Sequence, residues 1–461
     1  MFHIYQLNAR IGFAVILIFS TFLLSLPNVF AQNSGNYVPI ESNKKGKTAS
    51  TLETETRYKT LLQNLPKDYR DKYKELFGEM KTEKLKDIDR DYYFFNDSVT
   101  LYFKNIFQEI KKGNPTLPLT NLEFFVSRNY SPNALTSLDG TIAFNLSLVA
   151  NCQNESQVAF VICHELAHYK FKHPELSVKK MFDLLYSKQS QKQMKEIARS
   201  EFDAYDKAEK YLKNAVYNNR KHGREYEEQA DSLALQLLLN TRYDAKEAVQ
   251  SLLMLDKIDS LTYESNVELD KFFDSPQYKF KKSWLDEEET MFKKGKRVFD
   301  NKADEDSVKT HPSCKKRAAL IEGYLKNVVG KSGAKNLQSP EMFKNLAEKA
   351  EFETLVSAYD FNNVDYCLFQ TLKSLQNRPD NVFLKALIAQ CLNDIYDAQK
   401  EHTLAKIVSI PKGDQSTKYA AFLRFLNNMS LSEIAAVNFY YLNKQGKSYL
   451  NDEVEQIKLV S

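Results

Sequence analysis

Hydrophobic positions along most of this chain recur at spacings of three and four residues, which is the period of an amphipathic α-helix. The pattern predicts helices over residues 52–112 with a break near Asn96, over 155–172, over most of 176–257, and after Ser313. It also predicts three well-separated helices near the C-terminal end, at 342–358, 363–376 and 382–399. We therefore expect a mainly helical chain.

Two short segments have the pattern of strands instead. Residues 122–126 and 141–144 are short runs rich in β-branched and aromatic side chains. Turn signals at Asn133-Ala134 and Asp139-Gly140 come before the second run. The sequence thus predicts an α+β protein that is mainly α with a small β-sheet.

The first 31 residues have the pattern of a secretory signal peptide. Arg10 precedes an apolar run from Ile11 to Leu26, Pro27 ends the run, and Ala31 offers a cleavage position. An uncleaved anchor is the alternative, but the run is shorter than the ~20 apolar residues that a span needs. We expect an exported protein with no membrane span after cleavage, and a mobile, polar leader over residues 32–52.

Composition narrows the class of protein further. Glycine is scarce, at 13 of 461 residues, which argues against glycine-loop nucleotide binders and barrels. The net charge of +4 gives no indication of a nucleic-acid partner. Five cysteines without a C-x-x-C pair exclude a thiolate zinc site and a disulfide scaffold, and leave open which two would form a single bridge.

The clearest chemical signal is the run His164-Glu165-Leu166-Ala167-His168. This is the H-E-x-x-H pattern on a predicted helix, where histidines four residues apart share one face and can bind one metal ion. Glu165 lies one step around the helix, within reach of a water on that metal. A helix with two surface histidines is the alternative, and the apolar run at 157–163 argues against it.

A catalytic zinc needs a third protein ligand and an open position. The metzincin pattern would require glycine at position 171 and histidine at 174, but these residues are Phe171 and Pro174. His173 is one position off that register. It is expected to be a structural residue at the helix end, where a cation suits the helix dipole.

A second helix offers the third ligand. Glu227 and Asp231 share one helical face at a spacing of four residues, within a helix marked as buried by its leucines. Zinc bound by Glu227 would relieve the repulsion between these acids, with Asp231 accepting the outward N–H of a ligand histidine. The alternative is a solvated acidic stretch at a helix start.

Three further motifs occur in order around these helices: Asn133-Ala134 with Asp139-Gly140-Thr141-Ile142, Glu227-x-x-Ala230-Asp231, and Thr310-His311-Pro312-Ser313 followed by Arg317. Together with H-E-x-x-H they resemble the zinc metallopeptidase family that groups CAAX prenyl proteases, heat-shock membrane proteases of the HtpX type, and soluble periplasmic proteases that assist outer-membrane assembly. The resemblance covers roughly residues 100–330 and is greatest to the soluble periplasmic branch.

The resemblance implies a zincin-like, gluzincin-type metallopeptidase domain over residues 53–330, with its core at about 100–330. It implies one zinc ion per chain, Glu165 as the general base and a periplasmic location. The zinc ligands that it implies are His164, His168 and Glu227. It also adds His311, which in soluble relatives faces the zinc and either masks it or assists catalysis.

The C-terminal region, residues 331–461, is predicted to be helical. Helix pairs separated by Pro379 have a spacing similar to tetratricopeptide arrays, whose period is about 34 residues. The tryptophan and glycine of that repeat are absent, so an ordinary helical bundle is an equal alternative. Either arrangement would offer a surface to protein partners.

The sequence therefore predicts an exported zinc-dependent endopeptidase that hydrolyses polypeptide substrates, namely envelope or misfolded proteins. We expect an extended substrate to pair with the strand at 141–144. The alternative from another class is a latent, non-catalytic zinc-bound chaperone or adaptor that acts through its C-terminal helices. In that case His311 would be a fourth ligand that closes the zinc site.

Overall fold

The computed structural model describes residues 37–95, 98–119, 122–200, 204–286, 314–327, 340–411 and 417–445. The chain forms two compact units. The sheet unit comprises Ser42–Asp259 and Lys294–Thr354, and the helical unit comprises Met1–Glu41, Ser260–Lys293 and Leu355–Ser461. The predicted signal peptide at 1–31 lies outside the described residues, and the predicted domain boundary at residue 330 stays a prediction.

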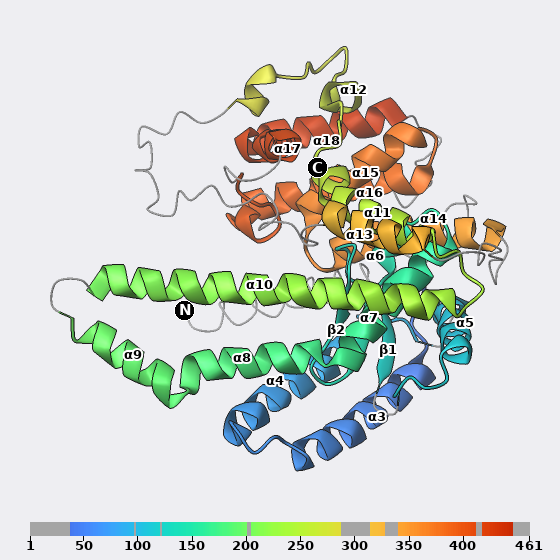
Figure 1. The fold of residues 1–461 in the computed structure, drawn as a ribbon. Helices are drawn as coiled ribbons and strands as arrows, with labels where there is room; N and C mark the ends of the chain where they lie inside the picture. The colour runs from blue at the N-terminus through green and yellow to red at the C-terminus, as the bar shows by residue number, and fades with distance from the viewer. Residues whose placement is uncertain are drawn as a thin grey trace, which may run out of the picture. The chain divides into compact units, whose positions relative to one another are not determined.

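The sheet unit holds three strands and a majority of the described helices (Figure 1). In chain order its elements are α3 (Lys44–Gln63), α4 (Arg70–Asp89), α5 (Ser98–Gly113), β1 (Glu123–Ser127), β2 (Ala134–Thr136), β3 (Thr141–Asn145), α6 (Leu146–Val149), α7 (Glu155–Phe171), α8 (His173–Tyr186), α9 (Lys188–Ala198), α10 (Ala204–Leu239), most of α11 (Glu247–Tyr263), α13 (Cys314–Lys326) and most of α14 (Pro340–Asp360). The last residues of α11 and α14 belong to the helical unit. The prediction of a mainly helical α+β protein is confirmed. Helix α3 begins within the predicted leader because Asn43 caps it, accepting hydrogen bonds from two backbone N–H groups of its first turn.

The three strands form one sheet in the order β1-β3-β2. β1 runs parallel to β3 and β2 runs antiparallel to it, with Val126 opposite Phe144 and Leu135 opposite Ala143. Two of these strands were predicted, whereas β2 was predicted only as a turn. Because β3 is paired on both sides, it cannot accept an added strand, and the expectation that substrate pairs with residues 141–144 is wrong.

Helix α7 is the centre of the sheet unit and packs chiefly against α10 and β2. Asn154 caps its first turn by accepting from the N–H of Gln157. Glu155 is fully buried there and accepts hydrogen bonds from the hydroxyls of Tyr102 and Tyr243. Residues 155–163 are all buried, so this helix crosses the core as its apolar sequence predicted.

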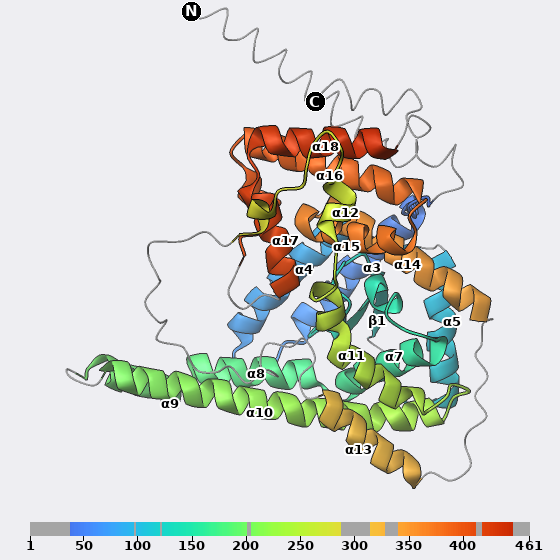
Figure 2. The ribbon, with the colours of Figure 1, turned by 90° about the horizontal axis from the view of Figure 1, so that it is seen from above.

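The segment between the two predicted ligand helices folds into a long helical hairpin. Helices α8 and α9 lead away from α7, and the 36-residue α10 returns beside them (Figures 1 and 2). At ~1.5 Å per residue, α10 is about 54 Å long. Its C-terminal half lies against α7, which brings the acidic motif at 227–231 back to the histidines.

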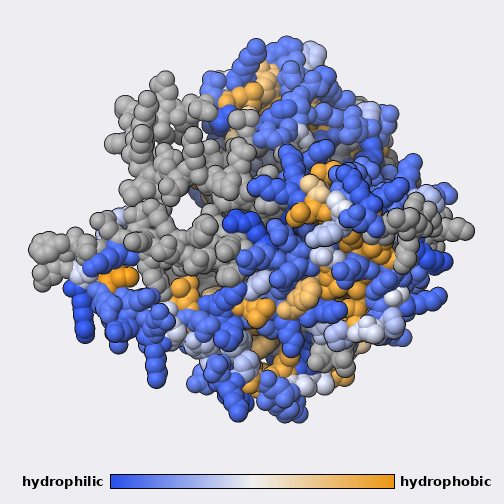
Figure 3. Space-filling view, in the orientation of Figure 1, coloured by the Kyte–Doolittle hydropathy of each residue, from blue (hydrophilic) through white to orange (hydrophobic). Residues whose placement is uncertain are grey.

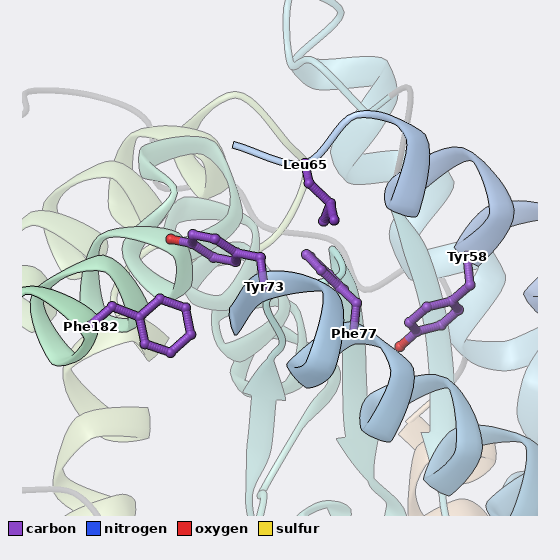
Figure 4. Packing of buried hydrophobic residues seen from close by; sticks show 5 residues of the cluster. All are labelled: Tyr58, Leu65, Tyr73, Phe77 and Phe182. Atoms are coloured by element: carbon purple, nitrogen blue, oxygen red, sulfur yellow. The ribbon is translucent and has the colours of Figure 1, made fainter. Parts of the chain in front are cut away.

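Helices α3 and α4 pack against each other through aromatic side chains (Figure 4). The cluster comprises Tyr58, Leu65, Tyr73, Phe77 and Phe182, the last of which comes from α8. The rings of Tyr73 and Phe182 meet edge-on with centroids 4.9 Å apart. This cluster therefore ties the N-terminal helices to the base of the long hairpin.

A buried ion network joins α4 to the sheet. The ammonium of Lys84, which is 6% exposed, forms ion pairs with Glu123 of β1 and with Asp139. Asp139 also accepts hydrogen bonds from the hydroxyls of Tyr58 and Thr141. Each buried charge thus has an opposite charge and hydrogen-bond partners, which buried ions require.

The helical unit is built from α12 (Leu269–Phe273), a 3-10 turn at Lys282–Leu285, α15 (Val364–Asn377), α16 (Val382–Lys400), a 3-10 turn at Leu404–Lys406, α17 (Thr417–Asn428) and α18 (Leu431–Gln445). Helix α16 packs between α15 and α18. The thiols of Cys367 and Cys391 lie 3.7 Å apart across α15 and α16, the two cysteines that the structure brings into contact among the described residues. The likeness to tetratricopeptide arrays stays a prediction.

On the face shown in Figure 3, apolar residues form small separate patches among polar ones, as is usual for a protein surface. Within the described ranges, no helix is both long enough and apolar enough to cross a bilayer.

Candidate metal centre

Helices α7 and α10 bring three predicted ligands together. The metal-binding atoms that His164, His168 and Glu227 offer all lie within 4.8 Å of one another, and no other group of this kind occurs in the described part of the chain. The Nε2 atoms of His164 and His168 are 3.0 Å apart. The carboxylate of Glu227 faces both rings. Its Oε2 lies 3.4 Å from Nε2 of His164, and its Oε1 lies 3.4 Å from Nε2 of His168. The two histidines of α7 and Glu227 of α10 therefore direct their donor atoms to one point.

Asp231 and Arg317 form a buried layer behind these ligands. Oδ1 of Asp231 lies 2.9 Å from Nδ1 of His164, on the side of the ring away from Glu227. Arg317 of α13 donates to both oxygens of Asp231, from Nε at 2.6 Å and Nη2 at 2.8 Å. Its Nη1 is 2.8 Å from Oε2 of Glu227. Arg317 therefore orients the two carboxylates at once, and Oε1 of Glu227 stays directed at His168.

The charges of this cluster favour a cation between its side chains. Burial alone would lower the pKa of His164, but Asp231 and Glu227 raise it to about 10. Burial by itself would raise the pKa of Glu227, but His164 and Arg317 outweigh this effect and lower the pKa. Burial together with the charge on His164 lowers the pKa of His168 to about 3. Two imidazoles and one carboxylate are also a donor set that Zn²⁺ prefers, so the residues present fit a zinc ion.

The comparison with known families agrees with this geometry. Residues 101–325 match the model of peptidase family M48. Over these residues the chain belongs to family M48. Peptidases of this family are zinc-dependent, so the zinc metallopeptidase predicted from the motifs is confirmed at the level of the family. No curated protein matches the chain at a significant level.

The M48 segment runs from α5 to α13 and so includes every residue of the cluster. The match does not distinguish branches of the family, and the periplasmic branch stays a prediction. His311 lies within the matched segment but outside the described residues. Its predicted role, masking the metal or assisting catalysis, therefore stays a prediction, and so does the latent alternative that depends on it.

Glu165 of the H-E-x-x-H run faces β2. Thr136 of this strand places its hydroxyl 2.6 Å from Oε2 and 2.9 Å from the backbone oxygen of Glu165. Burial raises the pKa of Glu165, while the positive charge on His164 and the Thr136 hydroxyl act in the opposite direction. The sequence reasoning missed Thr136, and its only signal was its place two residues after the Asn133-Ala134 turn.

His173 does not have the place that the sequence predicted. Lys172 adopts a left-handed conformation, with φ of 55°, which ends α7 and makes His173 the first residue of α8. A positive charge at this end of a helix is unfavourable, so the expected interaction with the dipole of α7 is wrong. His173 is instead 3% exposed, burial lowers its pKa, and its Nδ1 lies 2.9 Å from Nδ1 of His168.

Proposed function

We propose that this M48 protein is a zinc-dependent endopeptidase in which His164, His168 and Glu227 hold the metal. The observation that carries the proposal is the convergence of these three donors from two helices. Asp231 and Arg317 hold the donors from behind. Such support is typical of metal sites, where outer partners orient the ligands. A zincin-like fold is part of this proposal.

Glu165 is the general base of the proposed reaction. A bound zinc ion supplies Lewis acidity, which polarises the peptide carbonyl and makes water a stronger acid. Glu165 accepts the proton of the attacking water and then delivers it to the leaving amine. Burial raises its pKa toward neutrality, which suits a group that must both accept and release a proton. The hydroxyl of Thr136 fixes the direction of its carboxylate.

The substrate is proposed to bind as an extended strand along β2. This strand lies at the edge of the described sheet, next to α7. Backbone pairing at a free edge recognises polypeptides with little dependence on sequence, which suits misfolded proteins of the cell envelope as substrates. Export to the periplasm, and protein partners for the C-terminal helices, belong to the same proposal.

The test is the pair Glu165→Gln and His164→Ala, with casein cleavage and zinc content measured on each purified protein. Glu165→Gln should keep one zinc ion per chain and lose cleavage by at least ~10²-fold, since it removes the base and keeps the ligands. His164→Ala should lose both. Full cleavage by Glu165→Gln would overturn the proposed role. Comparative proteomics of envelopes from cells with either form would then name the proteins that accumulate uncleaved.

A further inference from the structure

We propose that His173 is a positioning residue of the metal centre, which accepts a hydrogen bond from Nδ1–H of His168 and thereby fixes the ring that binds the metal. This inference rests on the proposed zinc binding by His168. Its basis is the 2.9 Å separation between the two Nδ1 atoms and the deep burial of His173. The residue lies outside the H-E-x-x-H motif and on a different helix.

The direction of the hydrogen bonds follows from the metal-binding atom. His168 presents Nε2 to Glu227, so a neutral ring that binds metal there carries its hydrogen on Nδ1 and must donate it. Nδ1 of His173 is then the acceptor, and the hydrogen of His173 sits on Nε2. That atom lies 3.2 Å from Oε1 of Gln229, which completes a relay from His168 through His173 to Gln229.

The relay is held by the helix that supplies the third ligand. The ring of Tyr226 stacks on His173 with centroids 4.3 Å apart and planes 12° apart. Tyr226, Glu227 and Gln229 are neighbours on α10. Lys180 of α8 donates to the Tyr226 hydroxyl and lies over its ring. One stretch of α10 therefore fixes both the carboxylate ligand and the residue behind the second histidine ligand.

The two proposed histidine ligands thus differ in the charge of the side chain behind each ring. His164 faces a carboxylate, Asp231, whose charge is compensated by Arg317. His168 faces an uncharged imidazole that adds no negative charge. With Glu227 as the only anionic side chain among the three proposed ligands, a divalent ion held here would keep a net positive charge, which favours the activation of water. A carboxylate in place of His173 would reduce that charge.

The test compares two substitutions that remove different properties of the ring. His173→Phe keeps an aromatic ring to stack on Tyr226 but has no acceptor. His173→Asn loses the ring but keeps an amide oxygen close to the position of Nδ1. Zinc affinity, measured by competition with a chromophoric chelator, should fall ~10- to 100-fold in His173→Phe and by less than about threefold in His173→Asn. The absorption bands of the Co²⁺-substituted protein should change only in His173→Phe.

Two further measurements keep the outcomes separate. Thermal unfolding of the chelated proteins checks that each variant folds, and Gln229→Met should cause a smaller loss of zinc affinity than His173→Phe. The proposal is overturned if His173→Phe binds zinc like the unaltered protein, or if His173→Asn is weakened equally. If the unaltered protein binds no zinc, the proposed function fails and this inference fails with it. If the unaltered protein binds zinc and cleaves casein, and His173→Phe binds zinc with the same affinity, the role of His173 is overturned while the proposed function stands.

Discussion

Two aspartates, one in each unit, differ in whether a cation compensates the charge that the protein shields from water. Asp231 of the sheet unit is 2% exposed and accepts two hydrogen bonds from Arg317. Burial acts to raise its pKa, but Arg317 and His164 outweigh it and lower the pKa. Asp394 of the helical unit is partly buried and accepts a hydrogen bond from Tyr359 at 2.5 Å. Burial raises its pKa to about 6, because no cation lies against it among the described residues.

The difference separates a carboxylate that the fold keeps charged from one that the fold tends to neutralise. A charged Asp231 orients His164 and, through Arg317, Glu227, so the charge is part of the metal centre. Asp394 has a neutral partner, Tyr359, and burial of its charge costs stability. Arg317 thus offsets the cost of burying the charge of Asp231, whereas the neutral hydroxyl of Tyr359 does not offset that cost for Asp394.

The largest effect is expected from Arg317→Met, which removes the cation that pairs with Asp231. Without the guanidinium, Asp231 and Glu227 lose their compensating charge while their surroundings stay dry. We expect the free energy of unfolding of the chelated protein to fall by about 3–5 kcal/mol, as for other buried ion pairs that lose one partner. Urea denaturation followed by circular dichroism measures the loss, and added zinc should recover part of it.

The control for Arg317→Met is Lys316→Met on the same helix, where the side chain is exposed. This change should alter stability by less than about 0.5 kcal/mol. Equal unfolding midpoints for the two variants would show that Arg317 does not compensate the carboxylates of the metal centre.

In the helical unit we expect a substitution of Asp394 to stabilise the protein, whereas Arg317→Met destabilises it. The folded pKa of Asp394 is above its unfolded value of ~3.9, so the native state binds the proton more tightly, and stability is lost as pH rises from about 4 through 6. Asp394→Asn removes this loss and keeps an acceptor for Tyr359. We expect it to stabilise the protein by about 1–3 kcal/mol at pH 7 and hardly at all at pH 4.

Urea midpoints of Asp394→Asn at the two pH values test this directly. Tyr359→Phe, which removes the donor, should instead destabilise the protein at pH 7. If Asp394→Asn shifts the midpoint equally at pH 4 and pH 7, burial of the charge is not the cause.

The local parts of this protein could be predicted from its sequence, because they depend on spacing. Helical periodicity gave α7, and a four-residue spacing placed His164 beside His168 and Glu227 beside Asp231. Two strands also followed from their composition. These features need only the geometry of one helix or one strand, which the pattern of side chains carries directly.

The parts that could not be predicted depend on contacts between distant segments. His173 was misjudged because the left-handed Lys172 ends α7 and makes His173 the first residue of α8, a conformation that its sequence does not signal. β2 was missed because three residues are too few for a period, and its status as a strand depends on pairing with β3. The pairing of Arg317 with Asp231 could not be predicted, since 86 positions separate the two residues along the chain.

The smallest expected effect concerns Glu165, a buried acid on which burial and nearby polar groups act in opposite directions. Burial raises its pKa as for Asp394, but a hydroxyl and a nearby charge oppose the rise. Thr136→Val removes the hydroxyl, so the pKa of Glu165 should rise further and the acidic limb of the pH–rate profile should move up by about 0.5–1 pH unit. Zinc content should not change, and Thr136→Ser should restore the profile. An unmoved acidic limb in Thr136→Val would mean that the carboxylate of Glu165 does not use this hydroxyl when it acts as the base, and that its direction is set by the substrate instead.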